Sequence, residues 1–410
     1  MVCLNAFFSE LINDMLVIMP KIKTNQTNFH ITKIKILNFK FILLSQSPLF
    51  LMKKNVLIDV ERLKYPKSGI ANVCTSLIKG LDQKRAAFNY TFYGPKKNIP
   101  VTKSKFSIIN WKFWQKKIPI STSRYALIHT THQLSEYFHN IKKNQKKVVT
   151  LHDLNFLHDK SSERKINKSK GLVQKNIGNA DSIVCISEFV KDDFLKNKHL
   201  FTLKANVKID VVYNGLLFPE KKVFSSVQDY SFINEKFILN IGVLFPKKNQ
   251  NVLLDLISKN DRHLVLITSS AKSEYKEKFL EKIKSLELTE RVHILENVDN
   301  DEKYFLLQHC ESYCHPSLAE GFGIPPVEAM YFGKPVFLSK FTSLPEIGGD
   351  LAFYFEDFSA ENMNEVYLDG ISVFNKDKET FQAKLKERAL EFSYLKMAES
   401  YENIYKKLLD

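Results

Sequence analysis

The chain has 410 residues, 44% of them hydrophobic, and carries a formal net charge of +15. This length exceeds that of one typical domain, so we expect two, each with an ordinary apolar core. No apolar run reaches the roughly 18 residues of a membrane-spanning helix. The five scattered cysteines argue against a disulfide framework and fit a reducing cytoplasm.

The charge is unevenly spread along the chain. Residues 52–220 hold 31 Lys and Arg against 13 Asp and Glu, a balance of +18, whereas residues 221–410 hold 24 against 30, a balance of −6. A basic half indicates an anionic partner, for which nucleic acid, a membrane surface and a phosphorylated substrate all qualify. A solvated, lysine-rich surface is the alternative.

Residues 1–51 form an extension rich in Phe, Ile and Asn, with an apolar stretch at 41–51. A signal peptide needs basic residues before its apolar core and a small-residue cleavage site after it. The stretch up to Pro20 has no such basic lead, and Met52 opens MKKNVLIDV, which is typical of a natural start followed by a buried strand. We therefore expect a dispensable extension or a mis-assigned start. A short membrane-contacting segment is the alternative.

From Met52 onward, short β-branched runs alternate with helical segments. Most of the runs are continuously apolar, which is typical of parallel strands buried on both faces. A helix is expected at 71–81, ending in a Leu-Asp turn, and another at 187–197, with Ser187 as its N-cap. The strands expected in this half are 56–60, 90–94, 106–110, 125–131, 147–153, 182–187 and 208–215.

A polar break between Pro219 and Glu235 predicts a linker, and the alternation then restarts. The end of the chain, residues 392–409, has apolar side chains at helical spacing and predicts a long amphipathic helix. Strands are expected at 237–242, 263–268, 292–297, 312–317, 335–339 and 351–355, and helices at 251–257, 273–286, 303–310 and 326–333.

The predicted fold class is α/β, with two doubly wound, Rossmann-like domains facing each other across a cleft. Their predicted bounds are 52–219 and 220–390, and residues 391–410 are assigned to the C-terminal helix. Ligands of open α/β sheets bind at the carboxyl ends of the strands, so this cleft is the expected binding site.

The stretch HPSLAEGFGIPPVEAM (315–330) joins an expected strand to an expected helix. Seven residues separate Glu320 from Glu328, and a GFG turn follows the first of them. Glycines let the backbone approach a ligand, and free N–H groups at a helix start favour an anion. Because a carboxylate accepts two hydrogen bonds from a vicinal diol, the stretch predicts a ligand with phosphate and hydroxyl groups, such as a nucleotide sugar. The alternative is a helix-dipole role for Glu328 and a solvated loop position for Glu320.

The charge of such a ligand needs a cation. A strand is expected to end at Gly242, and Lys247 and Lys248 come just before a helix with Asn249 or Asn251 as its expected N-cap. These lysines are therefore the candidate phosphate contacts.

The segment EGFGIPPVEAM (320–330) resembles the Glu–seven residues–Glu signature of the retaining glycosyltransferases of family four, the group 1 glycosyltransferases, which have the GT-B fold. The resemblance covers nearly everything from Met52 onward. The C-terminal helix is similar to the one that crosses back onto the first domain in this family. Other segments that resemble the family, in its order, are SGIANV (68–73), VVTLHDLNFLHD (148–159), SIVCISEFVKDDF (182–194), VVYNGL (211–216), GVLFPKKN (242–249) and LPEIGGD (344–350).

The resemblance assigns the acidic stretch to the donor substrate. Glu328 would bind the ribose diol of the nucleotide. Glu320, with the amides of Phe322 and Gly323, would hold the transferred sugar, and Gly321 would belong to the same donor site.

The remaining assignments also follow from the resemblance. Lys248 would contact the donor pyrophosphate and stabilise the leaving group, the role of a cation where charge develops. Gly69 would let the N-terminal loop approach the phosphates, and His152 would lie near the donor sugar on the facing wall. Lys248, Glu320 and His152 are thus the predicted catalytic residues.

The family pattern is broken at one place. Many relatives carry arginine directly after the glycine of the strand-end motif, Gly242, or directly before the motif lysine. These positions are Val243 and Lys247 in this chain. Gly242 and Lys247 remain predicted donor-binding residues, although lysine lacks the bidentate phosphate contact of arginine.

Two groups of residues could be taken for metal sites. HCESYCH (309–315) holds two His and two Cys, but no second pair follows at the spacing of structural zinc, so we expect core cysteines. His152, Asp153, His158 and Asp159 could also ligate a metal. Because GT-B enzymes generally need none, the resemblance implies no metal and no cofactor.

The sequence therefore predicts a retaining hexosyltransferase that moves a mannose- or glucose-type sugar from a nucleotide sugar to a lipid-linked or surface-glycan acceptor, in the cytoplasm at the membrane face. The basic groups KKNQKK (142–147), Lys96–Lys97 and Lys116–Lys117 form either a solvated face or a contact with an anionic leaflet, where each Lys is worth about 1 kcal/mol. The alternative prediction is a non-enzymatic nucleotide- or glycan-binding protein on a degenerate scaffold. A nucleic-acid-binding protein rests on charge alone, since no nucleic-acid module accompanies the lysines, and no nucleic-acid partner is expected.

Overall fold

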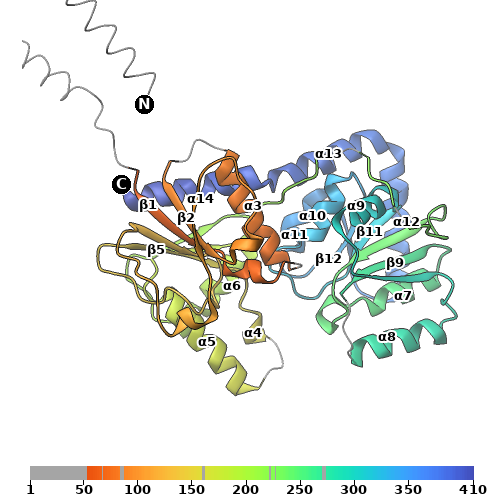
Figure 1. The fold of residues 1–410 in the computed structure, drawn as a ribbon. Coiled ribbons are helices and arrows are strands. Elements are labelled where there is room, and N and C mark those ends of the chain that lie inside the picture. Colours follow the sequence, from red (N-terminus) through yellow and green to blue (C-terminus); the bar gives the residue numbers. More distant parts are fainter. Residues whose placement is uncertain are drawn as a thin grey trace, which may run out of the picture. The chain divides into compact units, whose positions relative to one another are not determined.

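The computed structural model describes residues 53–66, 68–83, 87–158, 162–220, 223–226, 228–269 and 274–410. The prediction for residues 1–51 lies outside these ranges, as does Asp159, one of the residues considered as metal ligands. Residues Lys54–Asp410 form one unit, which contains two parallel sheets (Figure 1).

The first sheet has seven strands in the order β3-β2-β1-β4-β5-β6-β7. Its order reverses beside β1, so the carboxyl ends of β1 and β4 meet at a topological switch point. The strands are β1 (Asn55–Asp59), β2 (Asn89–Gly94), β3 (Ser107–Asn110), β4 (Leu127–Thr130), β5 (Lys146–Leu151), β6 (Ser182–Cys185) and β7 (Lys208–Val211). The connecting helices are α3 (Gly69–Gln83), α4 (Asn155–His158), α5 (Glu163–Ile177) and α6 (Glu188–Asn197).

The second sheet has six strands in the order β10-β9-β8-β11-β12-β13, which repeats the doubly wound pattern with its switch point beside β8. The strands are β8 (Phe237–Ile241), β9 (His263–Thr268), β10 (Val292–Glu296), β11 (Ser312–His315), β12 (Val336–Ser339) and β13 (Ala352–Phe355). The helices are α7 (Asn251–Ser258), α8 (Glu274–Ser285), α9 (Asn300–His309), α10 (Ile324–Tyr331), α11 (Leu344–Gly348), α12 (Ala360–Lys376) and α13 (Lys378–Glu391).

The continuous apolar runs become strands that are buried on both faces. All four residues of β4, β6, β11 and β12 are buried. The pairings within both sheets are parallel, as this pattern predicts. The prediction of an α/β chain with two doubly wound sheets is confirmed.

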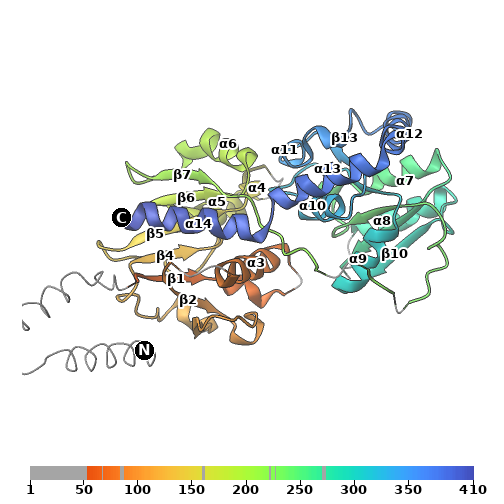
Figure 2. The same cartoon turned by 90° about the horizontal axis from the view of Figure 1, so that it is seen from above.

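The C-terminal helix α14 (Tyr394–Leu409) packs on the first sheet beside α3 (Figure 2). Its side chains bond into the sheet: the hydroxyl of Tyr405 lies 2.6 Å from Nδ1 of His129, and that of Tyr401 lies 2.8 Å from Oγ1 of Thr150. At Gly80 of α3, a Cβ would come within 2.6 Å of the Ala398 side chain, so the close approach of the two helices depends on glycine.

Several local predictions are corrected. The expected helix 71–81 begins earlier and continues past its Leu-Asp turn to Gln83, and α4, α5, α11, α12 and α13 are not among the predicted helices. Ser187 caps α6 as predicted, accepting from the Val190 amide at 3.1 Å. Neither asparagine caps α7. Its N-cap is Gln250, because Asn249, at a φ of 55°, ends the short 3-10 turn η5 (Pro246–Lys248) in the left-handed conformation.

In the part of the chain that the structure describes, none of the helices has the length and apolar character needed to cross a bilayer.

Candidate functional site

A cavity of about 250 Å³ opens at the carboxyl ends of strands from both sheets. The first sheet contributes the start of α3 and the loop after β5, and the second contributes η5 and the turn before α10. The structure brings seven of the predicted residues to this cavity: Gly69, His152, Lys248, Glu320, Gly321, Phe322 and Gly323.

The GFG turn has two positions that require glycine. A Cβ on Gly321 would lie 2.4 Å from the backbone oxygen of His152, so this residue lets the turn contact the loop after β5. Gly323 is the N-cap of α10 and has a φ of 107°, a conformation that L side chains rarely adopt. The hydroxyl of Ser187 donates to the Gly321 carbonyl at 2.8 Å and fixes the turn further.

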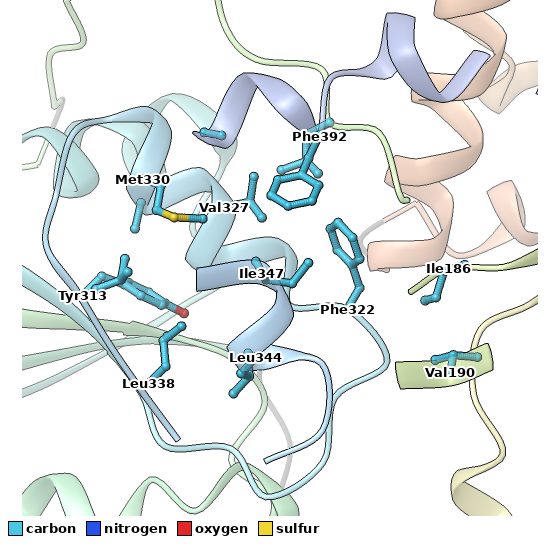
Figure 3. Packing of buried hydrophobic residues seen from close by; sticks show 14 of the residues in the cluster. Ile186, Val190, Tyr313, Phe322, Val327, Met330, Leu338, Leu344, Ile347 and Phe392 are labelled. Atoms are coloured by element: carbon cyan, nitrogen blue, oxygen red, sulfur yellow. The ribbon is translucent and has the colours of Figure 1, made fainter. Parts of the chain in front are cut away.

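The aromatic ring inside the turn anchors it in the core. Phe322 is buried against Phe392, with the ring centroids 5.4 Å apart in a T-shaped arrangement (Figure 3). Beneath the turn, Val327 and Met330 of α10 and Ile347 of α11 belong to the same buried cluster. The side chain of Phe322 therefore packs inward, although the residue also borders the cavity.

The chemical centre of the cavity is the carboxylate of Glu320. Its Oε1 accepts from Nζ of Lys248 in an ion pair and from Nε2 of His315 at 2.7 Å. Burial alone would raise the pKa of Glu320, but the bond from His315 and the charge of Lys248 outweigh it and hold that pKa below its ordinary value. Glu320 is therefore ionised at neutral pH.

The imidazole of His315 has a defined orientation. Burial is the main cause that lowers its pKa, so the ring is neutral at neutral pH. Because an ionised carboxylate only accepts, Nε2 carries the proton, and Nδ1 accepts from the hydroxyl of Tyr313 at 3.1 Å. The order of donation is Tyr313 to His315 to Glu320.

The second glutamate of the motif lies in a neighbouring cavity of about 150 Å³, which shares Ile324 with the first. Oε1 of Glu328 is 2.6 Å from Nζ of Lys303 on α9, and both side chains are largely buried. Nζ of Lys303 also lies 4.6 Å from the ring centroid of Tyr304. Asn300 completes the polar part of this wall.

His152 is buried on the facing wall of the first cavity. Its Nε2 donates to the backbone oxygen of Thr131 at 2.8 Å, and its amide donates to Oε1 of Gln133 at 3.1 Å. Burial lowers the pKa of His152, so the neutral ring has Nδ1 as an acceptor. Its ring stacks on that of His132, with centroids 5.2 Å apart.

Two predicted donor-binding residues do not line either cavity. The amide of Gly242 donates to the backbone oxygen of Ile267 at 2.9 Å and so extends β8. The backbone oxygen of Lys247 accepts from the amide of Leu318 at 2.7 Å and from the hydroxyl of Ser317 at 3.1 Å. Through these bonds Lys247 ties η5 to the loop after β11, and its contact with a donor stays a prediction.

Sequence reasoning missed three contributors to this region. His315 was considered only as a metal ligand, although it lies two residues after Tyr313 on one strand face and close to Glu320. No sequence motif marks Lys303, since it meets Glu328 only through the packing of α9 on α10. Glu346 of α11 accepts from the amides of residues 188 and 189 at 2.7 and 3.0 Å, and so binds the N-terminus of α6.

The metal-site candidates that the structure describes do not gather around one point. Among the described residues, no group of three or more His, Cys, Asp or Glu is placed to hold a metal ion. Cys310 and Cys314 are buried free cysteines, as predicted. His158 pairs with Asp193 at 2.9 Å.

Comparison with known proteins finds one family match over part of the chain and several relatives. Residues 227–389 match the model of the family described as "Glycosyl transferases group 1". Over 239 residues the chain is 26% identical to the O-antigen chain mannosyltransferase RfbU of Salmonella typhimurium, a match that covers 58% of this chain and 63% of that protein. Over 333 residues it is 25% identical to the O-antigen chain mannosyltransferase B of Escherichia coli, covering 72% and 84%. The chain thus spans slightly less than two thirds of the first relative.

A solved structure shows the same fold. Anabaena HepE, crystallised in complex with UDP and glucose, superposes with a TM-score of 0.62 at 18% sequence identity, covering 86% of this chain and all of that one. At this identity the likeness shows the fold alone. It confirms the predicted arrangement of two doubly wound sheets.

Proposed function

We propose that this chain, whose residues 227–389 match the family of group 1 glycosyltransferases, moves a hexose from a nucleotide sugar to a glycan acceptor. The observation that carries the proposal is the Lys248–Glu320 pair, which lies in a cavity that loops of both sheets line. A cation beside an ionised carboxylate suits a ligand with both phosphate and hydroxyl groups.

In this proposal, each charged side chain contacts one part of the donor. Lys248 exchanges its contact with Glu320 for the diphosphate, where it offsets the negative charge that grows as the sugar leaves. Glu320, held by His315, accepts from hydroxyls of the transferred sugar. Glu328, with one oxygen held by Lys303, accepts from the ribose diol in the neighbouring cavity.

The transfer is proposed to retain the configuration of the anomeric carbon, with His152 on the wall that faces the sugar. Relatives named as O-antigen mannosyltransferases support a mannose- or glucose-type donor and a lipid-linked or surface glycan as acceptor. We place the enzyme in the cytoplasm, peripheral to the inner face of the cell membrane, and propose that it needs no metal. Turnover that EDTA leaves unchanged is the expected result.

The deciding experiment is a thermal-shift screen against UDP-, GDP-, ADP- and dTDP-sugars, followed by transfer assays with the donor that binds. A donor that binds only the folded state raises the melting temperature. Proton NMR of the product should show the anomeric configuration of the donor. Inversion would contradict the retaining mechanism. Binding without any transfer or donor hydrolysis would favour the second candidate, a non-enzymatic binding protein on a degenerate scaffold.

A further inference from the structure

An exposed apolar and basic turn follows the edge strand β3. It consists of Lys112, Phe113, Trp114, Lys116, Lys117 and Ile118, and we call it the η3 surface after the 3-10 turn η3 (Phe113–Lys116) that it contains. Phe113 is 71% exposed, Trp114 46% and Ile118 68%, and all three lysines are exposed. Single exposed apolar residues are ordinary, but three large ones within six residues form a patch.

The patch is presented by an ordered turn. Gln115, the residue between the exposed ones, is buried, and its Oε1 accepts from the Lys112 amide at 2.6 Å and from the hydroxyl of Tyr93 at 3.0 Å. The amides of Lys117 and Ile118 both donate to the Trp114 carbonyl. With Gln115 fixed inward, its neighbours point outward.

The chain segment around the η3 surface is basic. Residues 95–135 contain eight Lys and Arg and neither Asp nor Glu. The amide of Lys96 donates to Oδ1 of Asn110 at 3.0 Å, so the lysines after β2 lie beside the end of β3. Lys116 meets Glu136 at 3.4 Å, an exposed pair of little strength. A partner of this surface therefore needs negative charge as well as an apolar interior.

We propose that the η3 surface docks the protein on an anionic lipid leaflet. Aromatic side chains favour the boundary of a bilayer, and lysines beside them bind lipid phosphates. A single-stranded nucleic acid would also suit aromatic rings and lysines. Ile118 decides between them, because an aliphatic side chain adds nothing to base stacking but gains from entry into an acyl region.

The position of the η3 surface also fits the proposed function. The link between docking and the acceptor rests on that proposed function, whereas the docking itself does not. The strands of the first sheet are parallel, so the loops after β1, β2 and β3 lie at one edge of it. Nζ of Lys64, after β1, lies 5.1 Å from the ring centroids of both Tyr65 and Trp111, which links that loop to the η3 surface. The same loop leads to Gly69 at the candidate site. Docking would therefore bring the site toward acceptors anchored in the leaflet.

The chain contains its own probe, since its two tryptophans are Trp111 and Trp114. Trp111 donates to the hydroxyl of Tyr137 at 2.7 Å, so a Trp111→Phe variant isolates the exposed Trp114. We expect the fluorescence of this variant to shift to the blue with phosphatidylglycerol-containing vesicles, and brominated lipids to quench it. An unchanged spectrum with bound vesicles would place the contact elsewhere and overturn the proposal.

Co-sedimentation of the full chain with vesicles completes the test. Phe113→Ser/Ile118→Ser and Lys116→Gln/Lys117→Gln should each weaken binding to phosphatidylglycerol vesicles by about tenfold or more. The controls Leu368→Gln/Leu390→Gln and Lys376→Gln/Lys384→Gln, which change exposed residues on α12 and α13, should bind as the parent does. Equal losses in the controls, or equal binding of the parent to neutral phosphatidylcholine, would overturn the proposal.

Two further readouts separate this inference from its rivals. If the η3 variants lose affinity for single-stranded DNA while the parent binds no vesicles, the surface recognises nucleic acid and the lipid proposal is wrong. The thermal shift with the donor should be the same in parent and η3 variants, because the η3 surface does not line either cavity. If the parent shows no transfer, and the η3 variants still lose vesicle binding, the proposed function is wrong and the docking proposal is supported.

Discussion

Lys303 and Glu328 form an ion pair 2.6 Å long, with side chains that are only 13% and 12% exposed. The pair joins α9 to α10 and fixes one oxygen of the carboxylate that the donor ribose is proposed to need. The same lysine thus has a structural effect and an effect on the ligand, and substitutions can separate the two.

Glu328→Gln should weaken donor binding by about 1.5–3 kcal/mol, because the amide keeps the shape but loses the hydrogen bonds of a charged acceptor. Lys303→Met should destabilise the fold by about 3–5 kcal/mol, since it leaves a buried carboxylate unpaired. The double variant should regain most of that stability but not the affinity for the donor. Denaturant unfolding and calorimetry with the donor measure the two effects. A double variant that recovers both would show that Glu328 has no contact with the nucleotide.

Glu320→Gln should impair sugar transfer and leave the affinity for the bare nucleoside diphosphate nearly unchanged. The reason is that Glu320 is assigned to the sugar hydroxyls, while the diphosphate is assigned to Lys248. Calorimetry with the nucleoside diphosphate and the nucleotide sugar, beside steady-state rates, gives the comparison. Loss of nucleoside diphosphate binding in this variant would mean that the two glutamates have been assigned to the wrong parts of the donor.

Lys248→Ala should lower kcat by about 100-fold or more while KM for the donor changes far less, because its charge is needed most where negative charge develops. Lys247→Ala should cost less, since Lys247 does not line the cavity. Lys259→Ala, an exposed lysine at the end of α7, is the neutral control. A rise in KM with unchanged kcat would assign Lys248 to ground-state binding alone.

His129 should make the fold sensitive to acid. Burial lowers the pKa of His129 to about 3, whereas the imidazole of an unfolded chain is protonated below about 6.5. Between these two pH values the unfolded state binds the extra proton, so stability falls as the pH falls through this window, by at most about 1.4 kcal/mol per unit for this group. His129→Gln should reduce the pH dependence of unfolding between pH 7 and 5. Tyr405→Phe, which removes only the bonded hydroxyl, should leave that dependence unchanged, and equal slopes in all three proteins would contradict the assignment.

The sequence was sufficient for the features that depend on local pattern. The apolar runs predicted buried parallel strands, and Ser187 was identifiable as a cap from its position before an acidic helical turn. Helix α12 was missed although Met363, Tyr367 and Ile371 recur at helical spacing and are buried. In α5, lysines obscure the pattern, and its buried residues gather near its end.

Contacts between distant parts of the chain could not be predicted in this way. The partner of Glu328 lies 25 residues earlier on another helix, and the carboxylate of Glu346 binds the start of α6 from 158 residues away. Only the packing of completed elements brings such groups together. The orientation of His315 likewise depends on burial and on the hydroxyl of Tyr313, neither of which a motif specifies.

Tyr313 and His315 lie on the same face of β11, paired in register with Val336 and Leu338 of β12. Successive side chains of a strand alternate between faces, so a slip of one residue would turn both rings away from Glu320. The hydrogen bond from His315 to the carboxylate in the cavity is therefore tied to the alignment of two strands in the core. Core substitutions in β12, away from the cavity, should therefore be able to lower activity while the fold persists. In kinetic assays such variants would resemble substitutions of active-site residues.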